Sequence, residues 1–312
     1  MIKKLVYSKH RPSERCGVAF FAEELARNLQ AKLTHNFHGY SKCEELIINM
    51  DILELVESEV SSLLNFITSG HAKKTILIMH DYRFSYLEDE LVKKCNAIVN
   101  ISAEPALTQL AKNKTIELFT PSFTQPPILG LKKSKMRPVS LAFGFFSPRK
   151  KSFKMYTSFY DFMITNYPQW YHIVVASAHT GHDESDALFI SRQLSSDSIL
   201  VLNFLPNSLL SEMISASDMG VCFYPTGIML NNAAPMAFFS QGKSVITTYG
   251  ELTPPEFKKF TLDGSRMNAI DFNNLKKIAS IGTRTKNYYW KHLSWDVFIK
   301  RMYDHLTLLT AS

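Results

Sequence analysis

The sequence predicts an α/β protein with two parallel sheets, each in a domain of its own. Short runs of β-branched and apolar residues alternate with stretches of helical periodicity, as in sheets whose parallel strands are joined by helices. The alternation stops in a proline- and glycine-rich passage between Pro121 and Pro138 and then starts again. A chain of 312 residues, 46% hydrophobic and 20% charged, has room for two such domains.

The first domain is predicted over residues 1–136. Its predicted strands are 4–8, 75–79 and 97–101. The stretch after the first strand is predicted to be an amphipathic helix, because apolar residues from Val18 to Leu33 recur at three- and four-residue spacing.

The second domain is predicted over residues 137–290, and a final segment over 291–312. Five further strands are predicted at 139–143, 172–176, 199–202, 220–223 and 244–247. Helices are predicted at 152–166, 183–194, 206–216, 229–241 and, at the end, 291–309. Two consecutive α/β units predict a ligand site at the carboxyl ends of their strands, in a cleft between the domains.

The net charge of +7 is concentrated in one region. The stretch from Lys132 to Lys154 contains eight basic residues and no acidic one, and the rest of the chain is almost neutral. Two interpretations stay open: a solvated linker, or a region that attracts phosphate groups or an anionic membrane. Since there is no repeat, zinc finger or RNP-like aromatic box, nucleic acid is not predicted as a partner.

Nothing in the sequence predicts export or a membrane span. No apolar run approaches the roughly 18 residues that a spanning helix needs. The apolar stretch near the amino terminus, Leu5 to Tyr7, is too short for a signal peptide. The four cysteines lie far apart, without the spacing of a metal site or a disulfide framework. A reduced, cytoplasmic protein is therefore predicted.

Two glycines follow predicted strands and are candidates for phosphate contacts. Gly17 precedes the first helix, where a backbone without a side chain and free helix amides favour phosphate, although a lone glycine here is also an ordinary turn residue. Gly144 ends the strand 139–143 and is followed by Arg149 and Lys150. These cations are candidates to neutralise a diphosphate leaving group, the alternative being a solvent-exposed charge run.

A third candidate segment lies between the predicted strand 220–223 and the predicted helix 229–241. Thr226, Gly227 and the helix-start amides are predicted to form another phosphate cradle. Asn231 is a candidate donor contact in the same segment, although a short polar residue at a helix start also serves as a cap.

Histidines give one candidate catalytic residue and no metal site. His80 follows the strand 75–79 and is a candidate for contact with an acceptor hydroxyl, the alternative being a structural histidine bonded to its own loop. His179 and His182 lie near Asp183, but loop histidines at such a place are usually incidental, so no metal is predicted.

Five segments, in this order, resemble the family 4 glycosyltransferases, which have the GT-B fold. Residues 15–25 match the family's first glycine turn and helix, and residues 143–150 match the strand, turn and lysine that hold the donor diphosphate. Residues 209–225 match the helix, Asp and strand before the donor loop. Residues 242–246 match the glycine and strand after the donor helix, and residues 293–296 match the serine–tryptophan start of the family's last helix. The resemblance implies two Rossmann-like domains facing a cleft, with the C-terminal helix packing back on the N-terminal domain.

The chain departs from the family pattern at three positions. The family usually carries two glutamates eight positions apart around the donor helix, and Met229 and Ala237 stand in those places. The arginine that often follows the strand glycine is replaced by Phe145, with Arg149 close enough to substitute. These changes remove a charged contact to the sugar and one to the phosphate.

The resemblance implies transfer of a sugar from a nucleotide-sugar to a hydroxyl acceptor, without a metal or other cofactor and with retained configuration. A glycan or lipid-linked acceptor in surface polysaccharide or glycolipid assembly, at the inner face of the membrane, fits the basic stretch. The alternative is a non-catalytic GT-B-like module that binds a sugar nucleotide, a glycan or a protein. A dehydrogenase or P-loop enzyme is not predicted, because neither glycine motif occurs.

Overall fold

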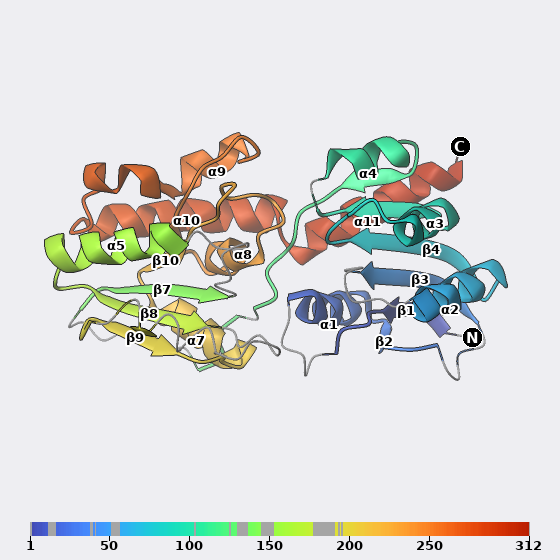
Figure 1. The fold of residues 1–312 in the computed structure, drawn as a ribbon, viewed down its shortest axis with the longest axis horizontal. Helices are drawn as coiled ribbons and strands as arrows, with labels where there is room; N and C mark the ends of the chain where they lie inside the picture. The colour runs from blue at the N-terminus through green and yellow to red at the C-terminus, as the bar shows by residue number, and fades with distance from the viewer. Residues whose placement is uncertain are drawn as a thin grey trace. The chain divides into compact units, whose positions relative to one another are not determined.

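The chain forms two compact units in a computed structural model (Figure 1). The structure describes residues 2–11, 17–37, 40, 42–50, 57–102, 104–124, 126–129, 137–144, 153–176, 191–192, 194 and 196–311. The first unit consists of Met1–Thr120 and Trp295–Ser312, and the second of Pro121–Ser294. The unit boundaries thus lie at Thr120 and Ser294, whereas the sequence analysis placed the domain boundaries at residues 136 and 290. The passage that begins at Pro121 belongs to the second unit.

In the part of the chain that the structure describes, the first unit holds a six-stranded sheet whose neighbouring strands are all parallel. In sheet order the strands are β2 (Lys32–Thr34), β1 (Ile2–Tyr7), β3 (Cys43–Met50), β4 (Ala72–Met79), β5 (Ala97–Asn100) and β6 (Thr115–Glu117). The chain runs from β1 to β2 on one side and then crosses to β3 on the other. The switch point of this sheet therefore lies between β1 and β3.

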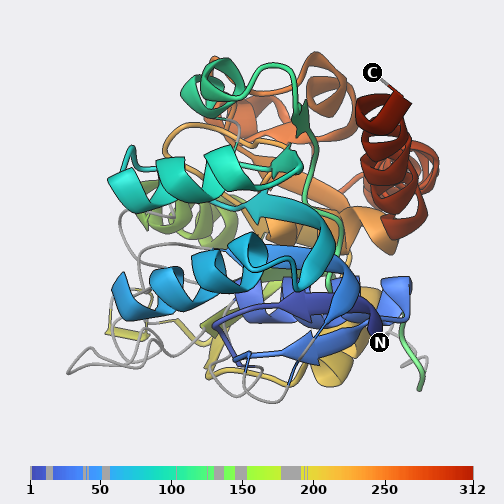
Figure 2. The same ribbon diagram turned by 90° about the vertical axis from the view of Figure 1, so that its right-hand side faces the viewer.

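Helices cover both faces of the first sheet. α1 (Gly17–Leu29) and α11 (Trp295–Ala311) contact each other on one face, where the ring of Phe21 lies 5.7 Å from that of Phe298. α2 (Glu57–Thr68) and α3 (Tyr86–Lys94) cover the other face, and α4 (Pro105–Leu110) follows β5. Figure 2 shows α2 and α3 on one side of the sheet and α11 on the other. The predicted return of the C-terminal helix to the first unit is confirmed.

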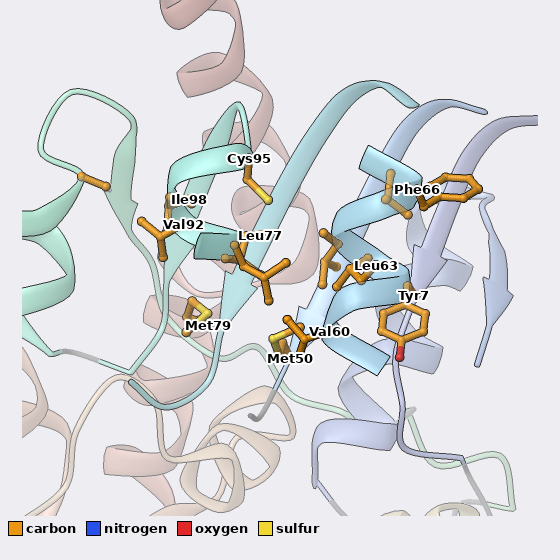
Figure 3. Packing of buried hydrophobic residues seen from close by; sticks show 14 of the residues in the cluster. Tyr7, Met50, Val60, Leu63, Phe66, Leu77, Met79, Val92, Cys95 and Ile98 are labelled. Atoms are coloured by element: carbon orange, nitrogen blue, oxygen red, sulfur yellow. The ribbon is translucent and has the colours of Figure 1, made fainter. Parts of the chain in front are cut away.

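The core under α2 shows why this face is apolar. Val60, Leu63 and Phe66 recur at three-residue spacing and are all buried. They pack on strand residues that alternate along the sheet, including Tyr7 and Leu77 (Figure 3). The intervening residues of each strand point to the opposite side of the sheet, toward α1 and α11. Most of β3 and β4 is therefore buried on both faces, as in parallel sheets generally.

The second unit also holds six parallel strands among the residues that the structure describes. In sheet order they are β12 (Leu262–Asp263), β11 (Ser244–Thr247), β10 (Met219–Cys222), β7 (Val139–Gly144), β8 (Tyr171–Ala176) and β9 (Ile199–Leu202). The helices are α5 (Phe153–Asn166), α7 (Asn207–Ala216), α8 (Ala233–Ser240), α9 (Pro255–Phe260), the 3₁₀-helix η3 (Gly264–Ala269) and α10 (Leu275–His292).

Close backbone packing fixes α8 between β10 and α10. Gly220 of β10 leaves room for the ring of Phe238, because a Cβ there would lie 2.6 Å from ring atoms. α8 ends at Ser240 and is followed by Gly242, whose φ is +77°. The N–H groups of Gly242 and Lys243 donate to the carbonyls of Phe239 and Phe238 at 3.1 and 2.9 Å, which is a Schellman motif.

Several predicted elements differ from the structure. The helix predicted at 229–241 begins only at Ala233. The single helix predicted at 291–309 is two helices in the structure, because α10 ends at His292 and α11 begins at Trp295. Most of the helix predicted at 183–194 lies outside the described residues. In the described part of the chain, no helix is long and apolar enough to cross a membrane.

Candidate functional site

The second sheet has the strand order of doubly wound nucleotide-binding sheets. Counted from β7, its six strands follow the order 3-2-1-4-5-6 when taken from β9 to β12. The switch point lies between β7 and β10, which pair in parallel with Gly220 opposite Leu141. Ligands of such sheets bind outside the carboxyl ends of the strands at this point. The segments that follow β7 and β10 are therefore the candidate site of this unit.

Gly144 ends β7 with a φ of +116°, a conformation that residues with a side chain rarely adopt. The glycine therefore allows the chain to turn out of the sheet at the switch point. Arg149 and Lys150 follow it in the sequence and lie outside the described residues, as does Phe145. α5 begins at Phe153, so both predicted cations belong to the connection between β7 and α5.

Gly227 lies where the loop after β10 crosses the loop after β11. Its φ is +84°, and a Cβ at this position would lie 2.2 Å from the backbone nitrogen of Gly250. A Cβ on Gly250 would in turn lie 2.0 Å from the carbonyl oxygen of Thr226. Two loops can approach this closely only with glycine at both positions. Gly227 thus shapes the loop after β10.

Two backbone amides of this loop are bonded within the protein. The N–H of Gly227 donates to the carbonyl of Tyr224 at 3.2 Å, and that of Ile228 donates to the carbonyl of Thr248 at 2.9 Å. These two amides are therefore not available to a phosphate, and the predicted cradle of Thr226 and the helix-start amides stays a prediction. Thr226 is exposed, so its hydroxyl can reach a ligand.

Among the described residues, no side chain caps the start of α8. Asn232 is the residue before the helix, and its side chain accepts from the N–H of Met229 at 2.7 Å rather than from the helix. Pro235, at the third helical position, has no N–H to offer. Asn231 is half-buried beside Asn232, whose side-chain amide donates to it at 3.4 Å.

Polar residues gather at the switch point of the first sheet. The side-chain amide nitrogen of Asn49, in β3, donates to the carbonyl of Val18 at 3.1 Å and lies 3.5 Å from the hydroxyl of Ser8, which follows β1. Nε2 of His80, which follows β4, lies 2.7 Å from Oδ1 of Asn49. The three residues come from strands that are neighbours in the sheet, so their carboxyl ends bring them together.

These bonds fix the tautomer of His80. A carbonyl can only accept, so the amide nitrogen of Asn49 faces Val18 and its Oδ1 faces the histidine. His80 therefore donates through Nε2–H and carries a lone pair on Nδ1. Burial, and then the nearby His10, lower the pKa of His80 from 6.5 to about 3. The ring is neutral at physiological pH and lies 4.8 Å from Phe21, edge to face.

Gly17 is the first residue of α1 and is exposed. None of the described residues lies within 4 Å of the place where its Cβ would be. The space beside Gly17 is therefore open among the described residues, and the approach of a phosphate ligand to this glycine stays a prediction. The residues before it, 12–16, lie outside the described ranges.

No protein-family model and no curated protein sequence matches the chain. Solved structures match nearly its whole length. Sucrose-phosphate synthase from Thermosynechococcus elongatus matches with a TM-score of 0.65 and 12% identity over 100% of both chains. An alpha-glucosyltransferase in complex with UDP and a 13-mer DNA matches with a TM-score of 0.66 and 13% identity over 98% of this chain and 99% of that one. WaaG, a glycosyltransferase involved in lipopolysaccharide biosynthesis, matches with a TM-score of 0.59 and 7% identity over 96% and 98%.

The chain has the GT-B fold. This fold is shared by glycosyltransferases that use nucleotide-sugar donors, and the predicted fold class is confirmed. At these identities the comparison concerns the fold, so the roles of individual residues depend on the local geometry.

This GT-B chain has no carboxylate at the two positions where the resemblance implies glutamates. Ala237 lies within α8 and is completely buried. Met229 lies in the loop before α8. No group of His, Cys, Asp and Glu in the described ranges could hold a metal ion, and His179 and His182 lie outside those ranges.

Asn49 was not predicted as a site residue, because the sequence predicts no strand at 43–50. The available signal was a polar residue within the apolar run from Leu46 to Met50. A polar side chain in a strand buried on both faces needs a hydrogen-bonding partner, and here the partner is His80.

Proposed function

We propose that the protein is a glycosyltransferase that moves a sugar from a nucleotide-sugar to a hydroxyl acceptor, without a metal or other cofactor. The observation that carries this proposal is the switch point of the second sheet. There Gly144, with its positive φ, leads the chain out of β7, and the sequence places Arg149, Lys150 and Lys151 before α5 begins. Such a place suits the diphosphate of a nucleotide-sugar.

The reaction breaks the bond between the anomeric carbon and a diphosphate oxygen, and forms a bond between that carbon and the acceptor oxygen. The proton of the acceptor hydroxyl passes to the departing diphosphate. Negative charge develops on the departing nucleoside diphosphate. Lys150, assisted by Arg149, stabilises that charge and so lowers the barrier. Thr226 and Asn231 contact the donor through their side chains, while Gly227 sets the course of the loop.

His80 positions the acceptor in this proposal. Its Nδ1 carries a lone pair and can accept a hydrogen bond from the attacking hydroxyl. With a pKa of about 3, the ring orients that hydroxyl but holds a proton only weakly. We propose a glycan or lipid-linked acceptor, in surface polysaccharide or glycolipid assembly on the cytoplasmic side of a membrane, and retention of the anomeric configuration.

A second candidate is a non-catalytic GT-B module that binds a sugar nucleotide, a glycan or a protein. The observation that favours it is the absence of a carboxylate at both Met229 and Ala237. Loss of a contact made in the transition state typically reduces rates by orders of magnitude. This candidate predicts binding without turnover.

Thermal-shift binding to UDP-, GDP-, ADP-, CMP- and dTDP-sugars tests the donor site. We expect one nucleotide class to stabilise the protein, and Lys150→Ala to abolish that stabilisation because the diphosphate loses its main counter-charge. His80→Ala should keep donor binding, because the histidine belongs to the other unit, but lower kcat by about 100-fold, as removal of a positioning group does.

Lys276→Ala is the matched control, because it also removes one cation from the second unit, at an exposed position in α10. It should leave donor binding unchanged. Donor binding without sugar transfer to any acceptor would favour the non-catalytic candidate. No stabilisation by any nucleotide-sugar would contradict the transferase and favour a non-catalytic module that binds a glycan or a protein.

We also propose that the protein contacts anionic membranes through the passage that precedes β7. Ile128 and Leu129 are 85% and 75% exposed, which is unusual for two adjacent aliphatic side chains. The N–H of Leu129 donates to the buried carboxylate of Glu212, which holds the backbone in place. Lys132, Lys133 and other cations follow in the sequence. Apolar anchors beside cations are typical of peripheral membrane contacts.

Co-sedimentation with phosphatidylglycerol vesicles tests this contact. Each cation near an anionic surface contributes about 1 kcal/mol, so replacing Lys132, Lys133 and Lys135 with alanine should weaken binding roughly 100-fold at low salt. Ile128→Ser should weaken it too, whereas Leu308→Ser, at another exposed leucine, should not. Equal binding to phosphatidylcholine and phosphatidylglycerol vesicles would refute the role of the lysines in membrane binding. No binding to either kind of vesicle would refute the membrane contact itself.

A further inference from the structure

The loop from Asp81 to Ser85 joins β4 to α3 and presents an aromatic ring at the carboxyl edge of the first sheet. Phe84 has a φ of +62°, which is a rare conformation for a bulky residue, and its side chain is 63% exposed. Tyr86, the first residue of α3, is 73% exposed. The loop starts directly after His80.

A buried carboxylate holds this loop in place. Glu88 is completely buried, and its oxygens accept from the N–H of Arg83 at 3.1 Å and from that of Ser85 at 2.8 Å. The hydroxyl of Ser85 accepts in return from the N–H of Glu88 at 3.2 Å, completing a capping box. The left-handed conformation of Phe84 is therefore imposed by a network of charge-assisted bonds.

The ring of Phe84 is supported from within the loop. Its centroid lies 4.8 Å from that of Tyr82, whose hydroxyl donates to Asp89 at 2.7 Å. Beside it, Asp81 and Arg83 form an ion pair at 3.0 Å in which both side chains stay about half exposed. The loop thus presents an apolar ring with hydrogen-bonding groups next to it.

This arrangement costs free energy in two ways, because the backbone is strained and an aromatic ring stays in water. Backbone outliers of this kind concentrate at binding sites, where the surrounding structure maintains them. The position of Phe84 also favours a binding role, since ligands of parallel sheets bind at the carboxyl edge.

We propose that Phe84 is a stacking platform for a sugar ring of the acceptor, with Asp81 and Arg83 bonding to the ring hydroxyls. A pyranose has an apolar face of C–H groups and a rim of hydroxyls, which matches a ring flanked by charged groups. An anionic membrane fits less well, because residues 81–90 contain four acidic residues and one basic residue. This inference rests on the proposed function and names its acceptor class as carbohydrate.

Binding to an array of defined oligosaccharides tests the platform, with Phe84→Gly as the first variant. Glycine removes the ring but accepts the positive φ, so the variant should fold at least as well as the wild type. We expect its glycan binding to fall at least tenfold, and that of Phe84→Tyr to stay within about threefold because an aromatic face is kept. Leu308→Ala removes another exposed apolar side chain of the same unit and should change nothing.

Nucleotide-sugar binding, measured on the same samples, separates this inference from the proposed function. If nucleotide-sugars bind and glycan binding is equal in wild type and Phe84→Gly, or absent in both, the platform is refuted while the donor site stands. Loss of vesicle binding rather than glycan binding in Phe84→Gly would also refute it. Glycan binding that depends on Phe84, without nucleotide-sugar binding, would support the platform and refute the transferase.

Discussion

Replacing Gly227 with alanine should lower the free energy of unfolding of the second unit by about 3 kcal/mol or more. The new methyl group would lie 2.2 Å from the nitrogen of Gly250 and 2.7 Å from Oγ1 of Thr253, at a φ of +84°. A backbone atom cannot move away without shifting the loop after β11. Urea unfolding followed by the fluorescence of Trp170 and Trp290, both in the second unit, measures the loss.

Gly17→Ala is the matched control, because the sequence analysis selected both glycines for the same reason. Its Cβ position is open and it begins a helix, so alanine should change the free energy of unfolding by no more than about 1 kcal/mol, in the stabilising direction. Comparable losses in both variants would contradict the loop crossing described above. If Gly17→Ala instead weakens donor or acceptor binding without changing stability, the open space at α1 is occupied by a ligand.

Gly282→Ala should destabilise the second unit by a similar amount, about 3 kcal/mol or more, although it places a better helix former within α10. The added Cβ would lie 2.1 Å from the carbonyl oxygen of Gly242 and 2.9 Å from the nitrogen of Ser244. Both atoms belong to the turn that ends α8 and starts β11. The gain in helix propensity, about 1 kcal/mol at most, is smaller than this steric penalty.

Ser280→Ala is the control in the same helix. Ser280 is exposed, so alanine should raise stability by a few tenths of a kcal/mol. If Gly282→Ala were as mild as Ser280→Ala in thermal and urea unfolding, α10 could not be packed directly on the turn at Gly242.

The strands that the sequence predicted well are those whose apolar runs are bounded by turns. β9 and β11 have the predicted limits, and β7 differs by one residue. β3 was missed because Glu44 and Glu45, which are half-buried, follow its first residue, Cys43, and hide the apolar run behind them. α10 was missed because it carries several lysines and, at Gly282, a residue that disfavours helices. Gly282 is explained by its close contact with Gly242, forty residues away in the sequence. The residues next to Gly282 in the sequence give no sign of this contact.

The candidate site was predicted less completely than the fold. A positive φ is observed at Gly144 and Gly227, where the sequence placed ligand-binding turns. The role of Gly227 depends on Gly250, which belongs to another loop. The tautomer of His80 depends on Asn49, thirty-one residues before it. Such pairs are set by the order of strands in a sheet, which periodicity along one segment does not determine.

The route of the chain between the units has a consequence for synthesis. The second unit, Pro121–Ser294, interrupts the first, whose α11 covers one face of the sheet with Phe298 against Phe21. During translation the first sheet is finished early, but this face has only α1 until the whole second unit has been made. The part of the face that α11 will cover therefore stays exposed for the time needed to add more than 170 residues, and exposed apolar surface of this kind is prone to aggregation.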